Sequence, residues 1–210
     1  MKEREQQKAS GKWFWSEHSR RDFFRRFLAL LPLPAVLTTA LGARTLPPTP
    51  QCGDDDEPTP SQTEGPFFTP RSPERRSLLE PGLKGQRLVV EGMVLTTSCT
   101  PIAGALLDFW QADENGAYDN FGYRLRGHQF TDDEGRFRLE TIVPGAYTGR
   151  TRHIHVKVQA PGGRILTTQL YFPGEPRNDR DRIFNPALLV DMQGTDDEPH
   201  ARFDFVLRAG

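Results

Sequence analysis

Apolar and polar side chains alternate at every second position in several short runs of the chain. In the stretch 135–147, Phe137, Leu139 and Thr141 alternate with charged residues, which predicts a β-strand with one solvent-facing side. Five other runs are strand-like and are predicted to form strands as well. They cover Gln86–Thr96, Gly104–Asp113, 153–160, 164–172 and 201–208.

Turn-forming sequences separate these runs. Asp132–Gly135, Val143–Gly145 and Ala160–Gly163 carry Gly, Pro and Asp residues that favour tight turns. The chain contains 19 glycines and 18 prolines, and many of them fall between the short runs. Because no long amphipathic helical pattern is found, the sequence predicts an all-β protein, an antiparallel β-sandwich.

The composition is that of a globular protein. Of the 210 residues, 36% are hydrophobic and 26% are charged, which is enough apolar material for one domain with a buried core. The formal net charge is −1, so the chain has no overall attraction to nucleic acid or to anionic lipid. We therefore expect no nucleic-acid partner.

The N-terminal segment has the residue order of an export signal. Within 19–43, the pattern Ser-Arg-Arg-x-Phe-x-Arg precedes an apolar run that ends in small residues, as in a twin-arginine signal. The run Phe27–Ala43 is short for a bilayer span and contains Pro32 and Pro34, which argues against a stable membrane anchor. We expect 1–43 to be a signal segment that directs export to the periplasm or the extracellular space.

A segment rich in Pro, Thr and acidic residues follows and shows no periodicity. We expect 44–80 to form an extended arm that leads into a β-sandwich domain over 81–210. The two cysteines are Cys52, in the arm, and Cys99, between the first two predicted strands. In an exported protein such a pair favours a disulfide, which here would tie the arm to the sandwich.

Two histidines, His153 and His155, lie one residue apart in a predicted strand. Side chains at i and i+2 of a strand project from the same face, so both imidazoles can reach one metal ion. Cupin proteins use a similar pair with a nearby Glu, but Val156–Gln159 contains no carboxylate. A ferrous site with two histidines and one carboxylate therefore lacks its third ligand.

Tyrosines are the other donors near this histidine pair. Tyr147 follows the Pro-Gly turn before the histidine strand, and Tyr118 follows the second predicted strand. Phenolate is a hard anionic oxygen donor, so two phenolates with two imidazoles would favour Fe(III) over Fe(II). Most tyrosines are core or rim aromatics, and that interpretation applies to most of the four in this chain.

Three stretches of the chain together resemble the intradiol ring-cleavage dioxygenases, the non-haem ferric enzymes that act on catechol, hydroxyquinol and protocatechuate. They are LLDFWQADENGAYDN, LRGHQFTDDEGRFRLETIVPGAYTGRTRHIHVKV and TTQLYFPGEP. The segment Thr59–Phe68 resembles the part of these enzymes that enters the active site. The resemblance extends from Thr59 to Leu207, with the motifs in the same order.

The resemblance implies a site. Its metal ligands, holding one Fe(III) per chain, would be Tyr118, Tyr147, His153 and His155. Arg150 falls where the family has a catalytic arginine, and Gln169 where it has a glutamine near the reacting carbon. Tyr118 would also act in catalysis, while Gly65, Pro66 and Arg150 would contact substrate.

The activity implied is the insertion of O₂ into a catechol-type diol, with cleavage between the two hydroxyl-bearing carbons to give a muconate-type diacid. Arg150 would stabilise the anions that develop during the reaction. Tyr118 is preferred over the nearby Tyr123 because it completes the pattern W-Q-A-x-x-x-G-x-Y. The sequence does not indicate which catechol is the substrate. The oligomeric state also stays open, and a homo-oligomer is one of the possibilities.

Two other functions fit parts of the sequence. The runs up to Tyr147 also resemble a transthyretin-like sandwich module that binds without catalysis. Such a module has no need for Arg150, the histidine pair and Gln169 together. An exported protein that binds copper or zinc would use the histidines and leave the tyrosines incidental.

Overall fold

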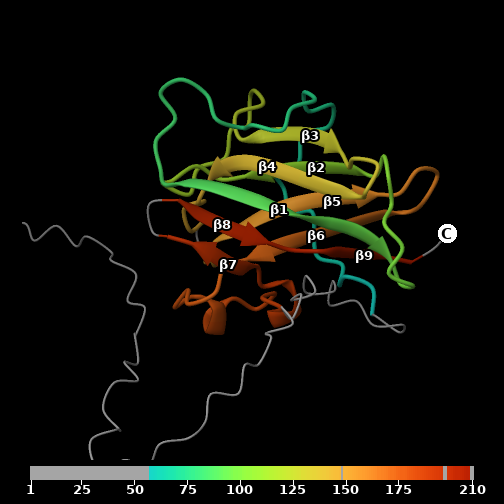
Figure 1. The fold of residues 1–210 in the computed structure, drawn as a ribbon. Helices are drawn as coiled ribbons and strands as arrows, with labels where there is room; N and C mark the ends of the chain where they lie inside the picture. Colours follow the sequence, from blue (N-terminus) through green and yellow to red (C-terminus); the bar gives the residue numbers. More distant parts are fainter. Residues whose placement is uncertain (1–56, 148, 196–197, 209–210) are drawn as a thin grey trace, which may run out of the picture. The chain divides into compact units, whose positions relative to one another are not determined.

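The computed structural model describes residues 57–147, 149–195 and 198–208, and these residues form two stacked β-sheets (Figure 1). The all-β sandwich predicted from the sequence is therefore confirmed. The elements are β1 (Arg87–Thr96), β2 (Leu106–Gln111), β3 (Arg126–Phe130), β4 (Arg136–Ile142), β5 (His153–Gln159), β6 (Ile165–Tyr171), η1 (Asn178–Arg180), η2 (Pro186–Leu188), β7 (Asp191–Gly194), β8 (Pro199–Arg202) and β9 (Phe205–Leu207).

The strands divide into a five-stranded and a four-stranded sheet. The first has the order β4-β1-β8-β7, with β9 also paired to β1, and the second has the order β3-β2-β5-β6. Strand β1 pairs in parallel with β8 and β9, and the other described strand pairs are antiparallel. The predicted run 201–208 is split in two where the Asp204 carboxylate accepts a hydrogen bond from the Met93 amide (2.9 Å).

Apolar side chains from both sheets form the core between them. In β5, Ile154, Val156 and Val158 are fully buried and belong to this core. The rings of Phe109 in β2 and Phe137 in β4 have centroids 5.9 Å apart, which joins the two sheets. Because neighbouring side chains of a strand point to opposite faces, the histidines of β5 lie on the outer face of the four-stranded sheet.

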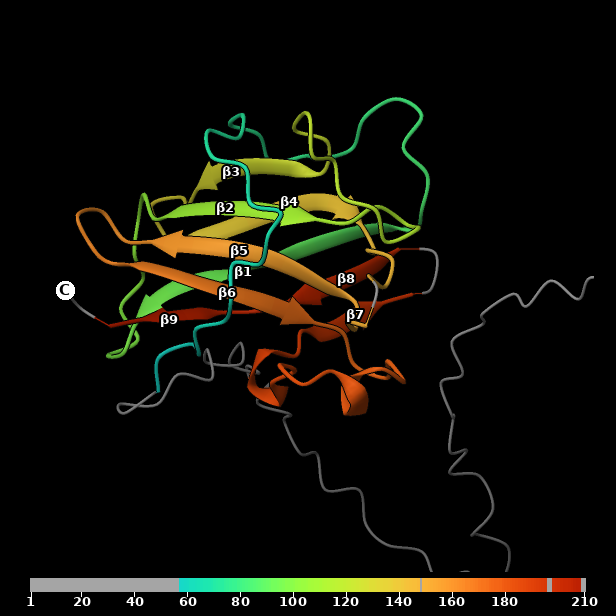
Figure 2. The same ribbon diagram turned by 180° about the vertical axis from the view of Figure 1, so that it is seen from behind.

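The arm segment 57–79 crosses this outer face (Figure 2). The Gln62 amide donates to β6, the Arg75 amide to β3 and the Leu78 amide to β4, each at 2.8 Å. The arm therefore covers the outer face of the four-stranded sheet and reaches the edge of the other sheet. Strand β5 is consequently buried on both faces, although only one of them is apolar.

Two sequence predictions fall outside the described residues. They are the signal segment 1–43 and the position of Cys52. Cys99 is disulfide-bonded, and its pairing with Cys52 stays a prediction. Within the described part of the chain, no helix is long and apolar enough to cross a membrane.

Candidate metal centre and active site

The register of three strands places the polar side chains of β5 beside those of its neighbours. His155 is paired with Trp110 of β2 on one side and with Gln169 of β6 on the other. His153 is paired with Tyr171. Directly paired residues point to the same face of a sheet, so these side chains share the outer face under the arm.

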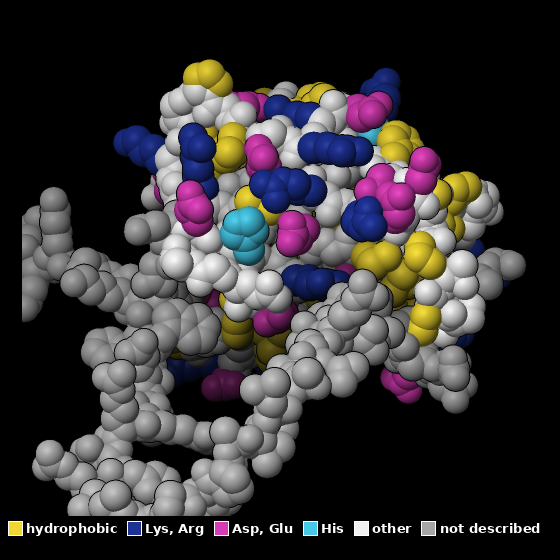
Figure 3. Space-filling view, viewed as in Figure 1, with side chains coloured by type: hydrophobic (Ala, Val, Ile, Leu, Met, Phe, Trp, Pro, Cys, Tyr) yellow, Lys and Arg dark blue, Asp and Glu magenta, His cyan; other side chains and the backbone are white. Residues whose placement is uncertain are grey.

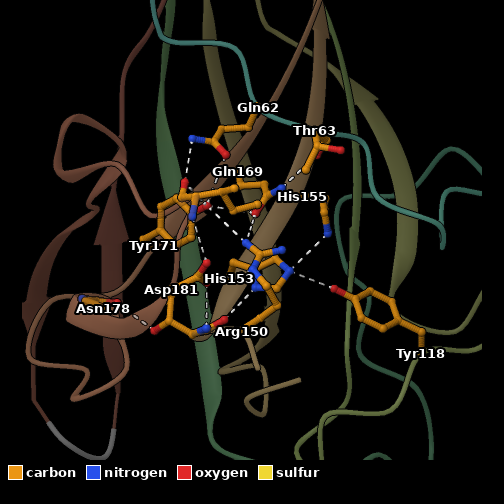
Figure 4. Close-up of polar contacts among 12 residues, drawn as sticks. Gln62, Thr63, Tyr118, Arg150, His153, His155, Gln169, Tyr171, Asn178 and Asp181 are labelled. Carbon is orange, nitrogen blue, oxygen red and sulfur yellow. Dashed lines mark hydrogen bonds and ion pairs between the residues drawn. The ribbon is translucent and has the colours of Figure 1, made fainter. Parts of the chain in front are cut away.

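The two imidazoles converge on a single point (Figure 4). Their Nε2 atoms are 3.2 Å apart, and the Tyr118 hydroxyl lies 3.2 Å from His153 Nε2. His153 Nδ1 lies 2.7 Å from the Thr151 carbonyl and donates to it in the neutral tautomer, which leaves Nε2 as an acceptor. Trp110 stacks on His155 with ring planes 6° apart and fixes the orientation of the second imidazole.

A close contact between two loops brings the two predicted tyrosine ligands together. The Asp113 carboxylate accepts from the amide of Ala117 (2.9 Å), and the Asp113 carbonyl accepts from the amide of Gly145 (2.7 Å). A Cβ at Gly145 would lie 2.4 Å from the Gly116 nitrogen, so only glycine allows the loops to approach this closely. Tyr118 and Tyr147 follow these glycines closely, and their ring centroids are 5.9 Å apart.

The arm supplies an aromatic wall to the site. Phe67 stacks on Tyr118 with centroids 4.5 Å apart and meets Tyr147 edge-on at 5.3 Å. Gly65 has a positive φ of 69°, and a Cβ there would lie 3.5 Å from His155 Cε1. Pro66 lies between these two residues and is exposed. The predicted substrate segment thus runs beside the histidine pair.

Arg126 holds the arm and the Tyr118 loop together. Its side chain is buried, with 1% of the residue exposed. Nη1 donates to the Phe67 carbonyl and Nη2 to the Asp119 carbonyl, both at 2.6 Å. One guanidinium therefore fixes both Phe67, which stacks on Tyr118, and Asp119, which follows Tyr118 in the chain.

Arg150 lies beside the histidines, in the segment that enters β5. Its Nη2 donates to Gln169 Oε1 (2.7 Å) and to the Tyr171 hydroxyl (3.3 Å), and its Nε donates to Asp181 Oδ2 (2.8 Å). Gln169 in turn donates from Nε2 to the Thr63 carbonyl of the arm (2.8 Å). The two residues predicted to act beside the metal therefore contact each other directly.

Burial shifts the pKa values of these groups in the direction that favours the neutral form of each. Burial lowers the pKa of His153 to about 4, although the hydrogen bond with Thr151 acts in the opposite direction. Burial also lowers the pKa of His155, with the neighbouring imidazole and Arg150 adding to the effect. Burial raises the pKa of Tyr118. Both imidazoles are thus neutral at neutral pH, the form that binds metal.

The donor set fits a metal ion. Two ligand atoms each about 2.1 Å from one ion and about 90–110° apart are about 3.0–3.4 Å from each other. The two 3.2 Å separations around His153 Nε2 fall in this range. Among the described residues no cluster of three His, Cys, Asp or Glu side chains could hold a metal, and the oxygen that lies beside the histidine pair is the Tyr118 hydroxyl.

Sequence reasoning missed several residues of this site. Asp181 lies in the loop after β6, and no periodicity or motif distinguishes it from the acidic residues around it. Tyr171, in contrast, could have been predicted from the sequence. It lies two residues after Gln169 on a strand, which places both side chains on one face. Tyr123 lies outside the convergence point and donates to the Pro70 carbonyl (3.0 Å).

Comparison with known proteins gives relatives with related activities. Chlorocatechol 1,2-dioxygenase of Rhodococcus opacus is 32% identical in a 173-residue alignment that covers 65% of this chain and 67% of that protein. The protocatechuate 3,4-dioxygenase beta chain of Burkholderia cepacia is 37% identical in a 153-residue alignment that covers 59% of this chain and 65% of that protein. The chain spans about half to two thirds of the length of the curated relatives it matches.

Solved structures and a family profile also match this chain. The dioxygenase domain of a dioxygenase and carbohydrate-binding protein fusion from Streptomyces sp. SirexAA-E has a TM-score of 0.71 and 56% identity, covering 73% of this chain and 100% of that one. The 3-chlorocatechol 1,2-dioxygenase of Rhodococcus opacus 1CP has a TM-score of 0.68 and 30% identity. The match covers 72% of this chain and 73% of that one. A family profile described as Dioxygenase matches residues 63–209. The chain therefore belongs to the intradiol ring-cleavage dioxygenase family.

Proposed function

We propose that this protein is a non-haem Fe(III) dioxygenase that cleaves a catechol-type diol between its two hydroxyl-bearing carbons. The observation that carries the proposal is the close approach of both the Tyr118 hydroxyl and His155 Nε2 to His153 Nε2, each at 3.2 Å. Arg150 and Gln169 lie hydrogen-bonded to each other beside this point. A simple binding module would not require this set.

The residues that would hold the iron are Tyr118, Tyr147, His153 and His155, one ion per chain. When bound, Fe(III) supplies an acceptor for both oxygens of the diol and draws electron density from the ring, which makes the ring reactive toward O₂. Neutral imidazoles and anionic phenolates suit this oxidation state. The remaining parts of the mechanism belong to side chains of this chain.

Arg150 supplies the positive charge of the site. Its guanidinium is fixed by Gln169 on one edge and by Asp181 on the other. A fixed cation stabilises the negative charge that develops on the oxygens of the opening ring, because it does not need to reorient during the reaction. Gln169 is fixed in turn by its hydrogen bond to the Thr63 carbonyl of the arm, and its side chain would face the reacting carbon of a bound diol.

Tyr118 is suited to accept a substrate proton. A diol has to lose its protons to bind as a dianion, and the Tyr118 oxygen lies beside the donor nitrogens, 3.2 Å from His153 Nε2. Burial favours the protonated form of this phenol, since burial raises the pKa of Tyr118. Phe67, stacked on the ring, limits the access of water to the phenol.

The substrate belongs to the catechol class, and the relatives name the candidates to test. Chlorocatechol, catechol, hydroxyquinol and protocatechuate enzymes are all among them. The iron-loaded protein should be incubated with each diol under O₂ and the products identified by mass spectrometry. A muconate-type diacid supports the proposal, whereas a semialdehyde from cleavage beside the diol, or no turnover of any of them, would refute it.

We also propose that the protein is exported. The support is the twin-arginine pattern around Arg20 and Arg21, in a segment that lies outside the described residues. The full chain should appear in the exported fraction of cells that have this pathway, and the double variant Arg20→Lys, Arg21→Lys should remain inside. Equal export of both proteins would contradict the proposal.

A further inference from the structure

We propose that Asp181 is a positioning residue that holds the Arg150 guanidinium in its working orientation, an inference that rests on the function proposed above. Asp181 Oδ2 lies 2.8 Å from Arg150 Nε. The Asp181 side chain is 2% exposed and the Arg150 side chain 20% exposed. Within the described part of the chain, no other carboxylate pairs with Arg150, so Asp181 provides its countercharge.

The Asp181 carboxylate is itself held by backbone and side-chain donors. The Thr151 amide donates to Oδ2 (2.9 Å), and the Ile183 amide donates to Oδ1 (3.2 Å). The Thr151 hydroxyl donates to Asn178 Oδ1 (2.7 Å), which binds the same loop to the start of β5. The loop after β6 therefore presents one rigid carboxylate to the arginine (Figure 4).

These contacts determine which guanidinium nitrogen of Arg150 has no hydrogen-bond partner. Nε donates to Asp181, and Nη2 donates to Gln169 and Tyr171. Because the guanidinium is planar, anchors at two of its nitrogens fix its rotation. Nη1 has no hydrogen-bond partner among the described residues. The geometry thus reserves this nitrogen as a donor toward a bound anion.

The change Asp181→Asn tests this role with minimal change in volume. Both carboxylate oxygens accept from N–H donors, so the amide group of Asn has to face at least one of them. The matched control is Asp179→Asn, the same change two residues earlier at an exposed position. Iron content and the visible spectrum provide readouts that are independent of turnover.

We expect Asp181→Asn to retain iron and colour but to lower kcat about 10–100-fold, the usual cost of losing a partner that orients a site residue. Asp179→Asn should match the unmodified protein in all three measurements. In an Arg150→Ala background, Asp181→Asn should have little further effect, because a residue that acts through Arg150 has nothing left to orient. Independent, multiplicative losses would overturn the inference.

A crystal structure of Asp181→Asn separates this inference from the proposed function. The Arg150 guanidinium should leave its contact with Gln169 in the variant, whatever the activity. If the guanidinium keeps its position, Asp181 does not position it and the inference is wrong. If the unmodified protein converts no catechol, the proposed function fails, and the same crystal structure still decides whether Asp181 orients Arg150.

Discussion

The two outer faces of the sandwich are built from the same alternating sequence pattern and end in opposite environments. On the five-stranded sheet, charged side chains of both signs are interspersed over an open surface (Figure 3). Arg138 of β4 pairs with Glu91 and Glu140 at 3.5 Å, with about half of each side chain exposed. Water solvates these charges, so such pairs contribute little to stability.

On the four-stranded sheet the arm excludes water from the outward-facing polar residues. His153 and His155 are 4% and 3% exposed, and Gln169 is fully buried. Each buried polar group then needs a protein or ligand partner, because burial without one is costly. The comparison shows that the arm, rather than the strands, turns one polar sheet face into an enclosed polar site.

The largest expected effect is the loss of metal when a histidine is removed from the arm-covered face of the four-stranded sheet. His153→Ala and His155→Ala should each abolish iron retention and turnover, because one imidazole and two phenolates are too few protein ligands for tight binding. His200→Ala is the control, since His200 lies in β8 of the other sheet. Metal analysis of the three purified variants provides the measurement, and full iron in either site variant would rule out these ligands.

The second expected effect is a difference in stability between variants of two arginines, one on each outer face. Arg126→Met leaves the partly buried carbonyls of Phe67 and Asp119 without donors and should lower the free energy of unfolding by about 1–3 kcal/mol for each. Arg138→Met removes only exposed ion pairs and should change it by about 0.5 kcal/mol or less. Urea unfolding of the metal-free proteins measures both. Equal losses would mean that cover by the arm does not distinguish the two faces.

A third effect concerns pH. In the metal-free protein, burial lowers the pKa of His153 to about 4, below the ordinary value of 6.5. The unfolded chain therefore binds this proton more readily, so stability is fully present above pH 6.5 and declines as the pH falls toward 4. The slope for one such group is about 1.4 kcal/mol per pH unit. His153→Gln should have a smaller slope in urea unfolding between pH 6.5 and 4, and an unchanged slope would contradict the assigned burial.

The sequence predicted the strand of the histidines well, because its alternation places Ile154 and Val156 in the core and His153 and His155 opposite them. It did not predict β3, in which the outward-facing Arg126 is charged and yet buried under the arm. Nor could it place Asp181, because that carboxylate reaches Arg150 through a loop without periodicity. Contacts made by the arm and by this loop depend on tertiary packing, which local patterns do not encode.

We propose that the arm-covered face of the four-stranded sheet holds ferric iron with tyrosinate ligands. The most direct test is the visible absorption spectrum of the purified protein after iron-replete expression, together with its metal content. We predict a broad visible band from tyrosinate-to-iron charge transfer and about one iron per chain, since the site offers one set of four ligands. A colourless protein that contains stoichiometric zinc would contradict this account.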